Sequence, residues 1–159
     1  MSTRAKIVTW ETVKRKITGH RKTGKKISFT NGCFDMLHFG HVSYLEAAKK
    51  KNRILIVGLN SDDSVRRLKG PPRPINPQKE RARVLAALEC VDYVTIFNED
   101  TPYELIKAIK PDVLIKGADW KGKEVAGSDV VLENGGKIEF AKYVAAHSTS
   151  NTIAMIQKQ

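Results

Sequence analysis

Two histidines stand on either side of one glycine in the stretch TNGCFDMLHFGHVSYL, residues 30–45. His38 and His41 are three residues apart, and the chain holds only four histidines in all. An imidazole can ligate a metal, pack in a core or donate a hydrogen bond to an anion. The residue types therefore allow three kinds of site, and the neighbouring sequence must distinguish between them.

A zinc site is the first possibility. On a helix, residues i and i+3 share one face, so His38 and His41 could ligate one ion, with Cys33 or Asp35 as a third ligand. The other two histidines lie in unrelated segments, and the two cysteines match no zinc spacing. We therefore expect no metal site built on the histidine pair.

Core packing and phosphate binding are the second and third possibilities. A histidine at a strand–helix turn is common, and Gly40 could serve only to bring helix and sheet together. Alternatively, the first turn of a helix presents free N–H groups to an anion, and Gly40 lets a phosphate approach the backbone. Two histidines around that glycine fit simple packing less well. At such a site both could donate hydrogen bonds to phosphate oxygens as charge builds in a transition state.

Strands and helices must alternate to position this stretch. Apolar runs predict strands, and periodic or capped segments predict helices. The strands are expected at residues 27–30, 54–59, 92–97 and 112–117, with a fifth after a turn at 134–136. The helices are expected at residues 41–51, 61–69, 78–89, 101–110 and 148–159, with a short one from residue 130. The pattern predicts a single-domain, Rossmann-like, doubly wound α/β fold over residues 1–159, with a parallel sheet of about five strands.

Polar, glycine-containing segments follow three of the predicted strands, at residues 31–41, 60–63 and 116–120. Sites in doubly wound sheets lie beyond the carboxyl ends of the strands, where the strand order switches. We therefore expect these three segments to converge at one edge of the sheet. A proline-rich loop, residues 71–77, lies between two of the helices.

The formal net charge of +11 favours an anionic partner. Much of it falls in KRKITGHRKTGKK, residues 14–26, which we interpret as a solvated basic helix or loop within residues 1–25 that packs on or flanks the domain. The run has no interleaved aromatic residues, so we expect no nucleic-acid partner. The apolar runs are too short to span a membrane, and MSTRAKIVTW lacks the apolar segment of a signal peptide; we expect no membrane contact and a cytoplasmic location.

These residues carry a family resemblance. The stretch NGCFDMLHFGHVSYL resembles the HxGH motif of the nucleotidyltransferase superfamily. Three further blocks, LNSDDSVRRLKG, RPINPQKERARVLAALECVDYV and DVLIKGADW followed by VAGSDVV, resemble the bacterial D-glycero-β-D-manno-heptose 1-phosphate adenylyltransferases in their stand-alone form. The likeness extends over nearly the whole chain.

The resemblance implies a reaction of ATP, as substrate with Mg²⁺, and heptose 1-phosphate that gives ADP-heptose and pyrophosphate. The product would serve the lipopolysaccharide core or a related surface glycan. A sugar phosphate is already anionic and attacks the α-phosphorus in line without a general base. Catalysis then consists of positioning and charge stabilisation. The family precedent also implies a homo-oligomer.

The resemblance also implies roles for individual residues. The catalytic residues would be His38, His41, Lys69 and Arg81. The nucleotide would be bound by Asn31, Gly32, Cys33, Phe34, Gly40, His41, Lys116, Gly117, Asp119, Ser148, Thr149 and Ser150. The other substrate would be bound by Asp35, Asn60 and Lys69. Asp35 is expected to order the loop or a water on Mg²⁺, and Arg81 to reach a phosphate.

Two competing functions stay open. A cytidylyltransferase acting on glycerol 3-phosphate or another alcohol phosphate shares the first motif. A basic module that binds a nucleotide or nucleic acid without turnover is also compatible with the charge, and it would be indifferent to loss of His41.

Overall fold

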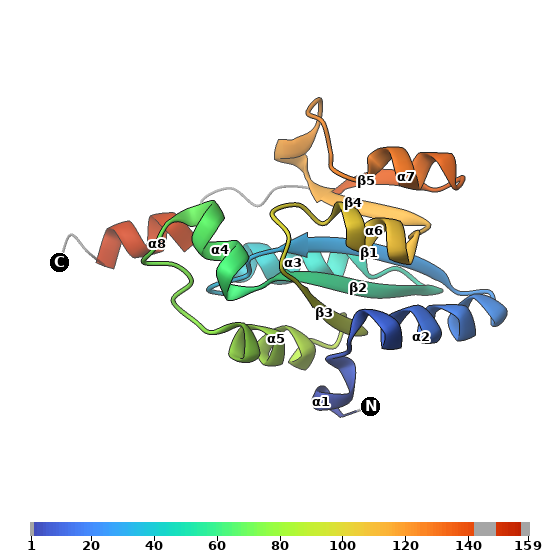
Figure 1. Ribbon diagram of the computed structural model, residues 1–159, viewed down its shortest axis with the longest axis horizontal. Coiled ribbons are helices and arrows are strands. Elements are labelled where there is room, and N and C mark those ends of the chain that lie inside the picture. Colours follow the sequence, from blue (N-terminus) through green and yellow to red (C-terminus); the bar gives the residue numbers. More distant parts are fainter. Residues whose placement is uncertain (1, 142–148, 157–159) are drawn as a thin grey trace.

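A five-stranded parallel sheet forms the centre of the computed structural model, which describes residues 2–141 and 149–156 (Figure 1). Its strands are β1 (Lys26–Gly32), β2 (Arg53–Asn60), β3 (Tyr93–Phe97), β4 (Val113–Gly117) and β5 (Lys137–Ala141). They lie in the order β3-β2-β1-β4-β5, and every pair is parallel. The predicted doubly wound α/β class and its five strands are confirmed.

Helices cover both faces of this sheet. They are α1 (Thr3–Lys6), α2 (Trp10–Lys22), α3 (Phe39–Ala48), α4 (Asp62–Lys69), α5 (Gln78–Ala87), α6 (Tyr103–Ile109), the 3-10 turn η1 (Ala118–Trp120), α7 (Ser128–Glu133) and α8 (Thr149–Ile156). One core cluster joins Val13 of α2 and Ile106 of α6 to the sheet. The other joins Leu45 of α3 and Leu85 of α5 to its opposite face. No helix within the described part of the chain is long and apolar enough to cross a membrane.

The helix boundaries follow from local caps. Ser61 accepts the Ser64 amide at 3.1 Å and begins α4, as the sequence predicted. The helix expected from His41 begins two residues earlier, at Phe39, because the His38 carbonyl already accepts the amides of His41 and Val42.

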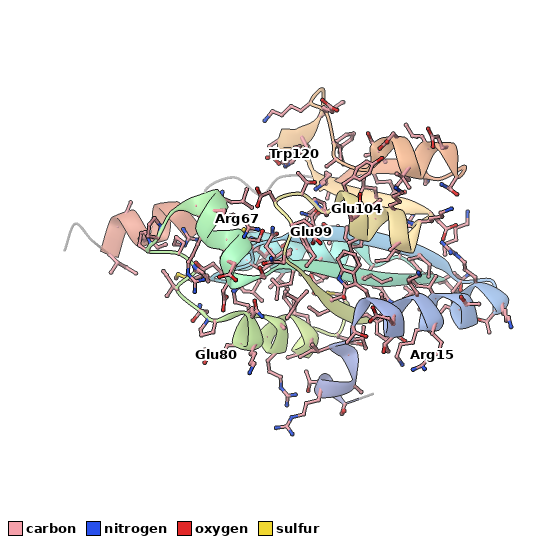
Figure 2. The ribbon with its side chains drawn as sticks, in the orientation of Figure 1. Arg15, Arg67, Glu80, Glu99, Glu104 and Trp120 are labelled. Atoms are coloured by element: carbon pink, nitrogen blue, oxygen red, sulfur yellow. The ribbon has the colours of Figure 1, made fainter. Side chains whose placement is uncertain are left out.

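The basic run, residues 14–26, lies mainly on α2. Val13 and Ile17 are one helical turn apart and buried, so they hold this helix on the sheet. The opposite side is solvated, and Figure 2 shows Arg15 projecting from it. Most basic residues of α2 therefore lie on the side of the helix that faces away from the sheet.

The switch in strand order lies between β1 and β4. The chain builds β2 and β3 on one side of β1 and then places β4 and β5 on the other. The predicted polar segments follow β1, β2 and β4, which are neighbours in the sheet, so their carboxyl ends meet at one edge, on the left in Figure 1. The predicted convergence is confirmed.

Candidate active site

The two motif histidines meet at the start of α3. His38 is the N-cap residue and His41 lies in the first turn. Their rings stack, with centroids 3.8 Å apart and planes 23° apart. The Phe34 ring meets His41 edge-on, at a centroid distance of 5.2 Å. The pair is thus fixed by packing at the end of β1.

Phe34 reaches this position through an uncommon backbone. Its φ is +43°, in the left-handed region, and its side chain is buried. A Cβ on Gly32 would lie 3.0 Å from the Phe34 ring. Gly32 therefore contributes to the site by leaving room for the ring that supports His41.

Burial dominates the charge state of His41. It lowers the pKa of this imidazole to about 4, and the neighbouring His38 acts in the same direction, while a hydrogen bond with the Met36 backbone opposes them. The ring is consequently neutral at pH 7 in the absence of ligand. A neutral imidazole still donates one N–H, and an anion beside it would favour the charged form.

Asp35 orders the proline-rich loop. Its carboxylate accepts the Ile75 and Asn76 amides at 2.9 Å and the Arg73 guanidinium at 2.5 Å. Burial would raise the pKa of Asp35, but the two amides and Arg73 outweigh it and lower the pKa. The Asn76 side chain donates to the Asp35 carbonyl at 2.6 Å as well. Of the two roles expected for Asp35, these contacts fit the ordering of the loop.

Arg81 is buried and held by hydrogen bonds within the protein. Its side chain is 1% exposed, and its guanidinium donates to the Cys33, Asn60 and Asn76 carbonyls at 2.6 to 2.9 Å. A fourth bond, of 2.8 Å, joins it to Asp62 Oδ1. These contacts occupy most of the five N–H donors of the guanidinium. The guanidinium is therefore bound to backbone rather than presented to a phosphate.

Asn60 is the last residue of β2, and Lys69 is the last residue of α4, the helix that follows this strand. The Asn60 amide is buried and donates to Ser64 Oγ at 2.9 Å, so it faces the helix. Lys69 ends α4, is exposed, and lies close enough to Cys33 for its charge to oppose the rise in the Cys33 pKa that burial causes. Lys69 is thus exposed whereas Arg81 is buried, and the ligand contacts expected of both stay predictions.

Lys116 reaches across from β4 to β1. Its Nζ donates to Asn31 Oδ1 at 2.5 Å, and the side chain is buried. Burial lowers the pKa of Lys116 to about 8, and Asp119 opposes this. A Cβ on Gly117 would collide with Asp119 Oδ1, so glycine leaves room for that carboxylate. Figure 2 shows Trp120 just beyond β4, on the segment that carries this cluster.

The structure describes only part of the carboxyl-terminal segment that was expected to bind phosphate, residues 148–150. Ser148 lies outside the described residues. Thr149 and Ser150 are the first residues of α8, and only their backbone is described. Their expected contact with phosphate stays a prediction.

Several residues that shape the site were not expected from the sequence. Arg73 and Asn76 hold Asp35, and Tyr44 of α3 bonds both Thr30 and the Ile115 carbonyl. The position of Arg73 within the proline-rich loop could have indicated its role, whereas no sequence feature near Tyr44 indicates its partners. No group of three metal-ligating side chains gathers among residues 2–141 and 149–156.

Comparisons with known proteins agree with this geometry. A family model described as cytidylyltransferase-like matches residues 29–147. Relatives called "Bifunctional protein HldE" include one from Aliarcobacter butzleri, 54% identical over 152 residues that cover 96% of this chain and 31% of the relative. Another, from Wolinella succinogenes, is 59% identical over 137 residues, which are 86% of this chain and 28% of the relative. The chain thus spans less than a third of the length of these relatives.

A solved structure shares the fold as well. The "lipopolysaccharide core biosynthesis protein from Thermoplasma volcanium GSS1" superposes with a TM-score of 0.60 and 27% sequence identity, covering 75% of this chain and 96% of that one. Together with the fold, these matches define a nucleotidyltransferase-like domain. The chain belongs to the cytidylyltransferase-like family.

Proposed function

We propose that this domain transfers AMP from ATP to D-glycero-β-D-manno-heptose 1-phosphate, giving ADP-heptose and pyrophosphate. The observation that carries the proposal is the stacked His38–His41 pair at the switch edge, with Lys69 as an exposed cation nearby. The choice of ATP and heptose rests on the sequence blocks that resemble the heptose enzymes. The HldE relatives and the similarity to a solved lipopolysaccharide core biosynthesis protein support the same pathway, lipopolysaccharide core or surface glycan synthesis.

In this proposal the sugar phosphate oxygen attacks the α-phosphorus of ATP in line and pyrophosphate leaves. The new P–O bond forms as the bond to the β-phosphate oxygen breaks, so no general base is required. His38 and His41 donate N–H groups to phosphate oxygens, where they stabilise the charge of the transition state. Asp35 and Arg81 act on the surrounding loops, and the enzyme works in the cytoplasm as a homo-oligomer.

Mg²⁺ belongs to the nucleotide substrate in this proposal. The described residues offer no three-ligand cluster, and the oxygens of Asp35 are occupied by Arg73 and two amides. Magnesium is commonly held by substrate phosphates and water with few protein ligands. Bound to ATP, it would neutralise charge on the phosphates.

The test is a substrate panel. ATP, CTP, GTP and UTP are each paired with heptose 1-phosphate and with glycerol 3-phosphate, and pyrophosphate release is measured. We expect turnover with ATP and heptose 1-phosphate. Turnover confined to CTP and an alcohol phosphate would replace the proposal with a cytidylyltransferase.

His41→Ala separates an enzyme from a binding module. Removing one preorganised donor lowers turnover by roughly 100- to 1000-fold. His20→Ala is the matched control, because His20 lies on α2 and bonds Tyr93, on the other side of the molecule's core from α3. Near wild-type turnover in His41→Ala would show that His41 does not stabilise the transition state.

A further inference from the structure

A buried charged contact crosses the switch point. β1 and β4 pair at Ser28–Val113 and Phe29–Leu114. Asn31 and Lys116 lie two residues beyond the last of these pairs, on the same face of the sheet as each other. There Lys116, a residue 7% exposed, donates from its ammonium to Asn31 Oδ1 at 2.5 Å.

This contact fixes which way the Asn31 amide points. A lysine ammonium has three donors and no acceptor, so the atom that faces it must be the amide oxygen. The NH2 end of Asn31 is then turned away from Lys116. Within the described part of the chain, that NH2 group donates to no protein acceptor. An amide held by a charged donor on one side therefore presents two N–H donors at the edge where β1 ends.

We propose that Lys116 is a positioning residue that holds the Asn31 side chain so that its NH2 group donates to an acceptor atom of the bound nucleotide. The proposal rests on the proposed function, because the ligand at this edge is the nucleotide of the transfer reaction. It assigns Asn31 a side-chain contact and makes Lys116 its support. Lys116 acts through Asn31 rather than through the base.

The surroundings of Lys116 fit this role. The carboxylate of Asp119, on η1, acts to raise the pKa of Lys116. The centroid of the Trp120 ring lies 5.1 Å from Lys116 Nζ and 6.0 Å from Lys123 Nζ. From α3, the Tyr44 hydroxyl bonds the adjacent Ile115 carbonyl, and the β5 partner of Lys116 is Phe140, which does not titrate. Burial lowers the pKa of Lys116 to about 8. Above that pH the neutral amine can also accept a hydrogen bond, so the amide is no longer fixed.

The test measures nucleotide binding directly. A non-hydrolysable ATP analogue with Mg²⁺, and its CTP counterpart, are titrated into each variant by calorimetry at pH 7. Asn31→Leu removes the donor without adding charge, and Asn31→Asp keeps an oxygen for Lys116 but removes the donor. Both are expected to weaken binding tenfold or more, while Lys123→Met, beside the same Trp120 ring, stays within twofold of wild type.

The pH profile tests the support role. Wild-type affinity is expected to fall above about pH 8, and Lys116→Arg, which cannot deprotonate, is expected to keep its affinity to pH 9. Lys116→Met is expected to weaken binding at all pH values. Wild-type affinity in Asn31→Leu would overturn the proposal. Weakening in Asn31→Asp alone would overturn it too, because it would show only that the new carboxylate repels the nucleotide. Because no sugar phosphate is present, a failed heptose reaction would leave this result interpretable.

Discussion

Removal of the Arg81 guanidinium is expected to destabilise the fold rather than to lower the rate of the reaction directly. Arg81→Met keeps a long apolar stem but leaves three carbonyls and the Asp62 carboxylate without their donor. Loss of one partner of a buried charged contact costs about 3–5 kcal/mol. Asp62 is 25% exposed and regains some water, which favours the lower half of that range.

The expected change in melting temperature follows from the chain length. For domains of this size, 1 kcal/mol corresponds to about 2–4 °C. The variant should therefore melt about 6–16 °C below wild type in a thermal scan followed by circular dichroism. Arg83→Met is the matched control, because Arg83 lies two residues along α5 and is exposed. We expect that variant to melt within about 2 °C of wild type.

Turnover distinguishes the two possible roles of Arg81. If Arg81 contacts phosphate in the reaction, the folded variant should lose turnover by orders of magnitude at any temperature. If it acts through the loops at Cys33, Asn60 and Asn76, the loss should accompany the loss of stability and be smaller well below the melting point. An unchanged melting temperature together with a roughly 100-fold or larger loss of turnover, the size expected for a lost catalytic donor, would refute the structural role.

Two further contacts give predictions. Asp35→Asn keeps one acceptor for the loop amides but loses the ion pair with Arg73. The free energy of unfolding should therefore fall by about 1–3 kcal/mol, and protease cleavage within residues 71–77 should rise. Asp63→Asn is the control, because Asp63 belongs to an exposed ion pair, and it should change neither quantity. Glu139 accepts Arg53 as well as Lys50 and Lys137, and the Arg53 bond chiefly lowers the pKa of Glu139. Because that pKa lies below the unfolded value near 4.3, its stabilisation is present above about pH 4 and is lost on further acidification; denaturant melts of Glu139→Gln and wild type should therefore differ at pH 7 and converge toward pH 2, and equal stability at pH 7 would exclude this contribution.

The sheet could be predicted from the sequence because each strand appears there as a short continuous run of apolar residues. β2 is a run of seven buried residues after Arg53, and such a run is typical of a strand covered on both faces. The caps at Ser61 and the glycine after Lys69 likewise set the bounds of α4. Parallel alternation then places the carboxyl ends of all the strands at one edge of the sheet, whatever the details of the loops.

The contacts within the site could not be predicted in the same way. Arg81 lies on a helix among other charged residues, and its burial depends on three carbonyls that come from separate segments. The Asn31–Lys116 contact depends on β4 lying next to β1, and the local sequence does not state which strand takes that place. Residue types and spacing therefore identified the histidine pair, while the partners of the cations required the strand order.

The strand order is also compatible with the proposed polyphosphate site in a strongly basic chain, because it keeps cations from crowding at this edge. At this edge Arg73 is bound to Asp35, Arg81 to backbone carbonyls and Lys116 to Asn31. Each of these cations orients a neutral donor or a loop. Among the residues with described side chains, the proposal leaves the imidazoles, with His41 neutral by burial, and the exposed Lys69 to face phosphate. Donors held in place by buried charges need little reorganisation when charge develops, which is the property that electrostatic catalysis of phosphoryl transfer requires.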